Sequence, residues 1–160
     1  MNYWILQWNP NDYKLGGGVP YQVGEKDWWG ISCLLSEVKP EDIAFIWQSI
    51  DYRHPLGPRP RGIYAKATIV SVPPHKPADQ AIIDELKKAD HETPSKQKGK
   101  PALLIKYIAS YYANPLTDAE LKKANLGKIH ILQCPRPEIS RLSGSDAAAI
   151  EVLLRAKGYK

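Results

Sequence analysis

Residues 38–49 read VKPEDIAFIWQS, and the rest of the chain can be interpreted outward from this stretch. Its centre, residues 43–47, is an apolar run of strand length bounded by polar residues, which predicts a buried strand. The stretch ends on Trp47, Gln48 and Ser49, which offer a ring face, an amide and a hydroxyl. Because side chains alternate along a strand, we expect Trp47 and Ser49 on one face and Gln48 on the other.

The flanking segments predict further short strands and a few helices. Strands are expected at Tyr3–Trp8, Ile63–Val70, Ala102–Tyr112 and Ile129–Leu132, with an irregular stretch beginning at Trp28. Helices are expected at Ala78–Ala89, after a capping box at Thr117–Glu120, and from a cap at Ser145–Asp146 through Arg155. Strands and helices do not alternate regularly, which argues against a doubly wound sheet. The predicted fold class is therefore α+β, with a small mixed or barrel-like sheet and helices at its edge.

The composition is typical of one globular domain. A chain of 160 residues can bury about two-thirds of its unfolded surface, so it needs no metal or disulfide for stability. No run approaches the ~20 apolar residues of a membrane span, and the N-terminus has no signal-like pattern, so we expect a cytoplasmic protein without membrane contact. Cys33 and Cys134 have no cysteine or histidine at ligand spacing, which favours buried thiols over a metal site. We expect no cofactor, and a monomer or weak oligomer.

The titratable residues form no recognisable catalytic motif. The sequence contains no Gly-x-Ser-x-Gly nucleophile elbow. The histidines, His54, His75, His91 and His130, stand in unrelated settings, and the carboxylates cluster only at turn starts and on predicted helix surfaces. The sequence therefore favours a binding protein over an enzyme.

Aromatic and basic residues give binding more support. All five tryptophans fall within the first 47 residues, and a ring stacked on a nucleic-acid base is worth ~1–3 kcal/mol. The net charge of +5 favours a polyanion as partner. Arg53, Arg59 and Arg61 follow the central strand and could hold flanking phosphates. Lys96 and Lys98 lie in a polar segment that is either a solvated loop or a further phosphate contact.

Several motifs resemble, in order and spacing, the EVE domain, a PUA-like relative of the YTH domain. They are Tyr3-Trp4-Ile5-Leu6-Gln7-Trp8-Asn9-Pro10, Trp28-Trp29-Gly30, the stretch at residues 38–49, and Arg61-Gly62-Ile63-Tyr64-Ala65. Looser agreement extends to Ile139-Ser140-Arg141-Leu142, so a single EVE domain is expected over residues 1–160. The resemblance implies a PUA-like mixed β pseudo-barrel flanked by helices. It also implies a concave aromatic pocket that reads a modified base without catalysis, in some relatives in connection with DNA modification or restriction.

The candidate site combines this resemblance with the residue types. Candidate base-pocket residues are Trp8, Asn9, Trp28, Trp29, Trp47, Gln48 and Ser49, and candidate phosphate contacts are Arg53, Arg59, Arg61, Lys96 and Lys98. The two side chains of Trp28 and Trp29 cannot share one direction, so one is expected in the pocket and the other in the core. Trp8 and Trp47 are candidates for either place, and Trp4 is expected in the core. The chain departs from many EVE domains at Glu41, where glycine is common, and at Trp8, where residues are smaller.

Three functional classes follow. The first is a reader of a modified base in DNA or RNA, either a methylated or hydroxymethylated cytosine or N6-methyladenine, with nucleic acid as the partner. The second is an enzyme, such as a nuclease related to other PUA-like families, and the third is a small-ligand or protein-interaction module. An RNA-binding or RNA-processing PUA-like domain is a further alternative to the first class. The aromatic and basic residues favour the first class, but they do not choose between DNA and RNA.

Overall fold

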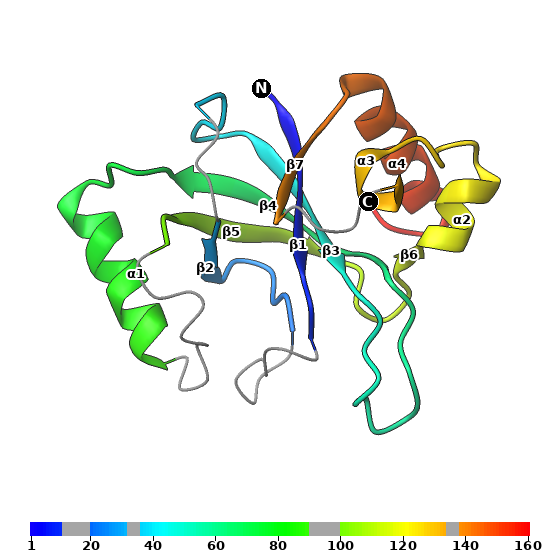
Figure 1. The fold of residues 1–160 in the computed structure, drawn as a ribbon, viewed down its shortest axis with the longest axis horizontal. Coiled ribbons are helices and arrows are strands. Elements are labelled where there is room, and N and C mark those ends of the chain that lie inside the picture. The colour runs from blue at the N-terminus through cyan, green and yellow to red at the C-terminus, as the bar shows by residue number, and fades with distance from the viewer. Residues whose placement is uncertain (11–19, 32–35, 90–99, 134–137) are drawn as a thin grey trace.

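Figure 1 shows the computed structural model, in which the strands form one curled sheet with helices at its two ends. The structure describes residues 1–10, 20–31, 36–89, 100–133 and 138–160. The strands are β1 (Tyr3–Trp8), β2 (Lys26–Gly30), β3 (Ile43–Gln48), β4 (Gly62–Ser71), β5 (Ala102–Ser110), β6 (Leu116–Thr117) and β7 (Ile139–Leu142). The helices are α1 (Pro77–Ala89), α2 (Asp118–Lys123), α3 (His130–Gln133) and α4 (Gly144–Ala156).

The sheet is mixed and has the strand order β2-β5-β4-β3-β1-β7, with β6 paired to β4. β1 runs parallel to β3, and the other neighbouring strands are antiparallel. The register places Trp8 opposite Gln48 and Gln7 opposite Trp47. The ends of β1 and β3, where the sequence places most candidate site residues, therefore lie side by side.

The inner face of the sheet carries a core that joins distant strands. Its members include Ala44 from β3, Ile105 from β5 and Ile139 from β7. Strands this far apart in a flat sheet could not share one core, so the sheet curls into a half-barrel. An ion pair also bridges the segments before β5 and β7, because Lys100 Nζ lies 2.7 Å from Glu138 Oε1.

Helices cover the outer face at both ends. α1 packs Ile83 against Leu104 and Trp28. α2, α3 and α4 form a second group, which covers Phe45 and Trp47 of β3. Burial of each such apolar side chain stabilises the fold by roughly 1.5–3 kcal/mol. No helix in the described part of the chain is long and apolar enough to cross a lipid bilayer.

Capping residues explain where the helices begin. α1 starts at Pro77, a residue type that suits the first helical position. The predicted capping box is confirmed, since Thr117 Oγ1 accepts from the Glu120 backbone N–H and the Glu120 carboxylate accepts from the Thr117 N–H. α4 begins two residues earlier than the sequence predicts. Ser143, rather than Ser145, is the cap, and its hydroxyl accepts from the Asp146 N–H at 3.0 Å.

Two assignments from the sequence were wrong. Trp28 and Trp29 belong to strand β2, which pairs with β5, rather than to an irregular stretch. Residues 129–132 lie in and around the short helix α3 rather than in a strand, and the Leu132 N–H donates to the Ile129 carbonyl at 3.0 Å. Apolar runs this short have no period that separates a strand from one helical turn.

A buried carboxylate holds the turn before β3. Asp42 is 2% exposed and accepts hydrogen bonds from the Trp4 indole at 2.9 Å, the Asn2 backbone N–H at 2.8 Å and the Lys39 backbone N–H at 3.1 Å. Burial alone would raise the pKa of Asp42, but these hydrogen bonds outweigh it and lower that pKa below its ordinary value. Trp4 is fully buried, as the sequence predicts.

Candidate functional site

Aromatic side chains from four strands and two loops pack into the core on the inner face of the sheet. We call this group the aromatic cluster, and it consists of Trp8, Tyr21, Trp29, Tyr64, Tyr107 and Tyr112. The ring centroid of Tyr21 lies 5.6 Å from that of Tyr107, 6.1 Å from that of Tyr112 and 6.2 Å from that of Trp8. Tyr21 is therefore central to the cluster, and its ring meets its neighbours tilted or edge-on, as aromatic pairs prefer.

A hydrogen-bond chain leads from the cluster to the end of β3. The Trp8 indole N–H donates to the Tyr21 hydroxyl at 2.6 Å, and this hydroxyl donates to Gln48 Oε1 at 2.7 Å. An indole N–H can only donate, so the Tyr21 oxygen accepts from Trp8 and gives its own proton to Gln48. Gln48 consequently turns its amide oxygen toward Tyr21. Its amide nitrogen has no hydrogen-bond partner among the described residues.

A carboxylate lies on the other side of the cluster. The Tyr107 hydroxyl donates to Asp27 Oδ2 at 2.7 Å, and the Trp28 backbone N–H donates to Asp27 Oδ1 at 2.8 Å. Because Tyr107 belongs to the inner core, the Asp27 carboxylate that accepts from it is an acceptor on the inner side of the sheet. The inner face thus combines ring faces with an acceptor at Asp27 and an N–H donor at Gln48.

The buried tyrosines of the cluster remain protonated. Burial raises the pKa of Tyr21 well above its ordinary value, and the hydrogen bond from Trp8 offsets this only in part. Burial also raises the pKa of Tyr107, and the nearby charge of Asp27 adds to the rise. These hydroxyls therefore serve as neutral hydrogen-bonding groups and not as bases.

Tyr21 has a backbone conformation that is costly for a bulky residue. Its φ of 58° lies in the left-handed region. Such conformations cost roughly 1–3 kcal/mol and persist where the surroundings fix them, often at functional sites. Here the surrounding rings and the two hydrogen bonds of its hydroxyl hold Tyr21 in place.

The cluster is partly open to solvent. Trp8, Trp29 and Tyr112 are half-buried, whereas the other three rings are buried. These three rings therefore keep part of their surface exposed, while the buried tyrosines pack in the core beside them.

Two of the predicted arginines border the cluster. The guanidinium carbon of Arg59 lies 3.9 Å from the ring centroid of Tyr112 and 5.2 Å from that of Tyr64, a cation–π arrangement. Arg59 also donates to the Tyr112 carbonyl. Arg53 is exposed, and its guanidinium donates to the carbonyl of Pro10, just beyond the end of β1. Positive charge therefore lies along the rim of the cluster.

An open groove of about 540 Å³ lies beside Arg59. It is lined by the loop before β4, by the turn at residues 113–117, and by Glu120 and Lys157, which form an ion pair at 2.6 Å. Its lining contains no tryptophan, tyrosine or phenylalanine. The aromatic cluster is therefore the better platform for a planar ligand.

The described residues contain no group of three or more His, Cys, Asp or Glu side chains that could hold a metal. They do contain a serine–histidine pair, in which Ser71 Oγ lies 2.7 Å from His75 Nδ1. His75 Nε2 lies 2.8 Å from the Ala102 carbonyl, which can only accept, so Nε2 carries the proton. Ser71 is 6% exposed, and this pair joins the end of β4 to the start of β5 away from the aromatic cluster.

One protein family matches the chain over nearly all of its length. The model described as "EVE domain" matches residues 2–153. The chain belongs to the EVE domain family. A search of curated proteins finds no match to this EVE domain.

Solved structures share the fold of this EVE domain at low sequence identity. A hypothetical protein from Leishmania major has a TM-score of 0.63 and 16% identity, over 99% of this chain and 97% of that chain. A Pseudomonas syringae protein has a TM-score of 0.53 and 19% identity, over 94% and 98%. Human THYN1, in complex with DNA containing 5-methylcytosine, has a TM-score of 0.56 and 16% identity, over 96% and 97%. These neighbours confirm the predicted PUA-like pseudo-barrel flanked by helices.

Within the EVE domain, Trp47 lies away from the aromatic cluster. It is 1% exposed and packs on the outer face with Tyr111. Of the two places that the sequence allows for Trp47, pocket or core, the structure gives it the core position. Ser49 shares this side, and its hydroxyl accepts from the Gln7 amide at 3.3 Å. The predicted alternation is confirmed, but the faces are exchanged, because Gln48 points into the cluster. Alternation shows which residues share a face, but it does not show which face is inner.

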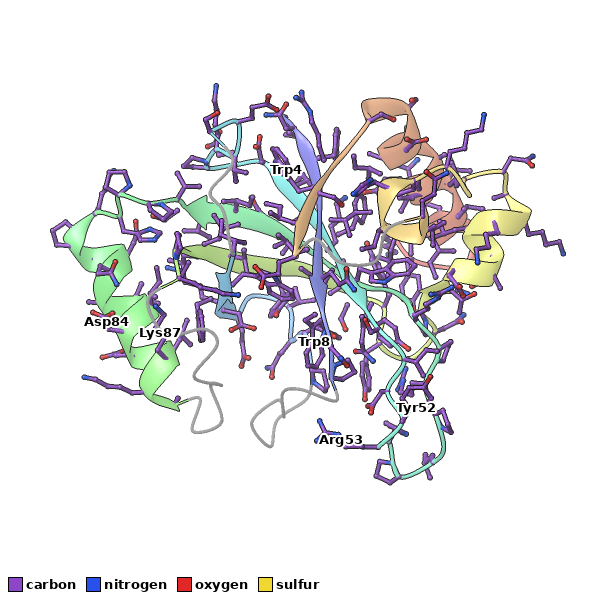
Figure 2. The ribbon with its side chains drawn as sticks, in the orientation of Figure 1. Trp4, Trp8, Tyr52, Arg53, Asp84 and Lys87 are labelled. Carbon is purple, nitrogen blue, oxygen red and sulfur yellow. The ribbon has the colours of Figure 1, made fainter. Side chains whose placement is uncertain are left out.

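Trp28 and Trp29 divide between the two faces of β2. Trp29 packs against the inner core, whereas Trp28 lies beneath α1, where Lys87 Nζ is 5.0 Å from its ring centroid. Figure 2 labels Lys87 on α1, well away from Trp8. The EVE domain therefore directs Trp29 toward the cluster. Asn9, which follows Trp8, is half-buried at its rim.

The remaining predicted phosphate contacts lie apart from the cluster or outside the described residues. Arg61 Nε is 2.6 Å from Asp118 Oδ2, so its charge is balanced within the fold and joins β4 to α2. Lys96 and Lys98 fall outside the described residues, as do both cysteines.

The sequence did not indicate Tyr21, Asp27, Tyr64 and Tyr107 as members of the candidate site. The alternation of Leu103, Ile105 and Tyr107 could have placed Tyr107 on a core face. Nothing local indicates Tyr21, because it comes from a loop whose position depends on the whole sheet.

Proposed function

We propose that this EVE domain binds nucleic acid by receiving a modified base against the open rings of the aromatic cluster. The observation that carries the proposal is that half-buried Trp8 and Trp29 share one face with the polar groups of Gln48 and Asp27. The structure of THYN1 with DNA containing 5-methylcytosine supports it, because that protein has the same fold.

The polar groups of Asp27 and Gln48 match the hydrogen-bonding edge of a base that carries an exocyclic amino group. A carboxylate accepts from the amino group of cytosine or adenine, and an amide N–H donates to a ring nitrogen or carbonyl. Asp27 and Gln48 would take these two roles. The modification itself adds apolar surface, and burial of one methyl group contributes ~0.8 kcal/mol, or about a fourfold preference over the unmodified base.

A base inside a duplex cannot reach these rings, so the bound base must leave the stack. Arg53 at the rim is placed to contact a phosphate beside that base. The domain would act as a binding module, since stacking and two hydrogen bonds explain recognition without a chemical step.

The test is a titration of tryptophan fluorescence with short oligonucleotides. The probes carry 5-methylcytosine, N6-methyladenine or the unmodified bases, each in DNA and in RNA. Because Trp8 and Trp29 would stack on the base, we expect quenching that saturates at lower concentration with one modified probe than with its unmodified counterpart. Equal affinity for modified and unmodified probes would contradict the proposal.

Neighbouring tryptophans provide a matched pair of variants. Trp29→Leu should lower the affinity for the preferred probe about tenfold, because one stacking ring is lost. Trp28→Leu removes the same ring from the opposite face of β2 and should leave the affinity unchanged. A loss that is equal in both variants would assign the effect to the stability of β2. Circular dichroism shows whether both variants are folded.

A further inference from the structure

The loop between β3 and β4 projects from the body of the domain beside the aromatic cluster. Figure 2 shows Tyr52 and Arg53 on this projection, beyond the Trp8 end of β1. Two backbone hydrogen bonds between Asp51 and Arg59, at 3.1 and 2.9 Å, close the base of the loop. The loop is therefore a defined protrusion.

A turn at the apex of the loop presents a leucine to solvent. The Gly57 N–H donates to the His54 carbonyl at 3.0 Å, and Pro55 occupies the second position of this turn, where proline is favoured. The Leu56 N–H donates to His54 Nδ1 at 3.2 Å. Leu56 itself is 92% exposed. Backbone contacts hold the turn, so the leucine side chain is available to a partner.

Contacts at the loop base fix its position relative to the cluster. Arg59 stacks on Tyr112, one of the open rings, and Arg53 donates to the carbonyl of Pro10. A nucleic acid that places a base against Trp8 must therefore pass beside this loop. The partner has an anionic backbone and a stacked apolar interior, which fits a loop that carries arginines at its base and a leucine at its apex.

We propose that Leu56 is a wedge that enters the gap left in a duplex when the recognised base is extruded. This inference rests on the proposed function and specifies its partner as double-stranded nucleic acid. Extrusion costs a few kcal/mol of stacking and pairing. An apolar side chain inserted between base steps offsets part of that cost. Tyr52, 68% exposed on the same loop, would lie against the neighbouring backbone or base.

The experiment compares duplex and single-stranded DNA that carry 5-methylcytosine. Leu56→Ser should weaken duplex binding about 10- to 100-fold, the value of burying one leucine side chain, and leave single-strand binding unchanged. Leu56→Met should keep duplex binding near that of the native chain. Val152→Ser is the matched control, because Val152 is an apolar residue of α4 that is 62% exposed, and it should change neither affinity.

A second readout follows the gap itself. 2-Aminopurine placed next to the 5-methylcytosine becomes brighter when its stacking is disturbed. The native chain at saturation should therefore increase the 2-aminopurine fluorescence of the duplex, whereas the Leu56→Ser variant at saturation should not increase it to the same level. If Leu56→Ser binds duplex as well as the native chain, or loses single-strand binding equally, the wedge is overturned while the proposed function stands. If the native chain prefers 5-methylcytosine in neither form of DNA, the proposed function for this base and the wedge both fail.

Discussion

Tyr21 links the rings of the aromatic cluster with the polar end of β3. Its hydroxyl accepts from Trp8 and donates to Gln48, and this fixes which atom of the Gln48 amide faces outward. One phenol oxygen thus holds both the half-buried Trp8 ring and the Gln48 amide that we propose contacts the base. The strained φ of this residue indicates that its surroundings, rather than local preference, hold it there.

Tyr21→Phe should reduce both stability and binding. The substitution leaves the Trp8 N–H and the Gln48 oxygen without their partner, which costs roughly 1–3 kcal/mol when the groups stay buried. Denaturant unfolding measures the first effect, and titration with the preferred modified probe measures the second. Tyr159→Phe is the control, since the hydrogen bond of its hydroxyl within the described residues is an exposed one, to the Asn114 carbonyl at 3.2 Å. Equal results for the two variants would show that the Tyr21 hydroxyl is dispensable.

Trp47→Ala should destabilise the fold by roughly 3–5 kcal/mol, the cost of removing a large buried ring. The reason is that Trp47 is 1% exposed beneath α2–α4. Trp8→Ala should cost clearly less stability, because Trp8 is half-buried, but it should abolish discrimination of the modified base. Urea unfolding and the fluorescence titration separate the two effects. A Trp47→Ala variant that is as stable as the native chain but no longer binds the modified probe would instead indicate that Trp47 contacts the base.

At the level of helices and strands, the sequence predicts most elements but not their faces. Long alternating or periodic segments such as β4 and α1 are found because burial imposes a period on many residues. The alternation of side chains along β3 is predicted correctly, so the residues that share a face are known. Which of the two faces is the inner one depends on strands that come later in the chain. Glu41 shows a local conflict, since its φ of 72° suits the glycine that is common there in EVE domains.

The turn that Asp42 holds should make the fold sensitive to acid. The folded pKa of Asp42 lies below its unfolded value of about 3.9, so its contribution is complete above that value and is lost as the pH falls through the folded pKa. The free energy of unfolding should therefore drop below about pH 4, where Asp118 and Glu120, whose pKa values are also lowered, add to the effect.

Asp42→Asn measures how much the Asp42 carboxylate contributes to the loss of stability in acid. An amide has one acceptor oxygen, so at least one of the donors around it loses its partner, which should cost roughly 1–3 kcal/mol at pH 7. The dependence of stability on pH should become shallower below about pH 4. Unfolding curves at a series of pH values measure both quantities. A slope identical to that of the native chain would assign the acid sensitivity to the other carboxylates.

The close approach of β4 and β6 requires a glycine. A Cβ at Gly62 would lie 2.5 Å from the Leu116 carbonyl oxygen and 2.9 Å from Thr117 Cα, and backbone atoms cannot easily move aside. Gly62→Ala should therefore cost roughly 1–3 kcal/mol in thermal or denaturant unfolding. Gly144→Ala has no such neighbour within 4 Å and should be neutral or slightly stabilising. Similar costs for both variants would argue against this steric account.

For the whole molecule, the fold class could be predicted from the sequence, but the site could be predicted only in part. The irregular order of elements and the motifs around Trp8 and Gln48 indicate the half-barrel and one end of the candidate site. Tyr107 and Asp27 come from other strands, and they reach the same place because the sheet order sets β5 beside β2. Such long-range neighbours leave no local pattern.

Binding of nucleic acid should weaken with salt, because the chain carries a net charge of +5 and phosphate contacts release counterions. With about two phosphate contacts, as from Arg53 and Arg59, raising the salt concentration about fourfold should lower the affinity roughly 7- to 12-fold. Arg53→Ala should make the slope of log affinity against log salt shallower by about one. Lys88→Ala, exposed at the end of α1, is the comparison and should leave it unchanged. A salt-independent affinity would contradict phosphate recognition.

The position of β1 has a consequence for synthesis on the ribosome. β1 is made first, yet its two neighbours in the sheet are β3 and β7, and β7 lies at residues 139–142. Until β7 emerges, a nascent chain leaves one edge of β1 unpaired, and the inner core lacks Ile139. Cooperative folding is therefore expected only after nearly all of the domain has been translated, and truncation before β7 should expose an edge strand prone to aggregation.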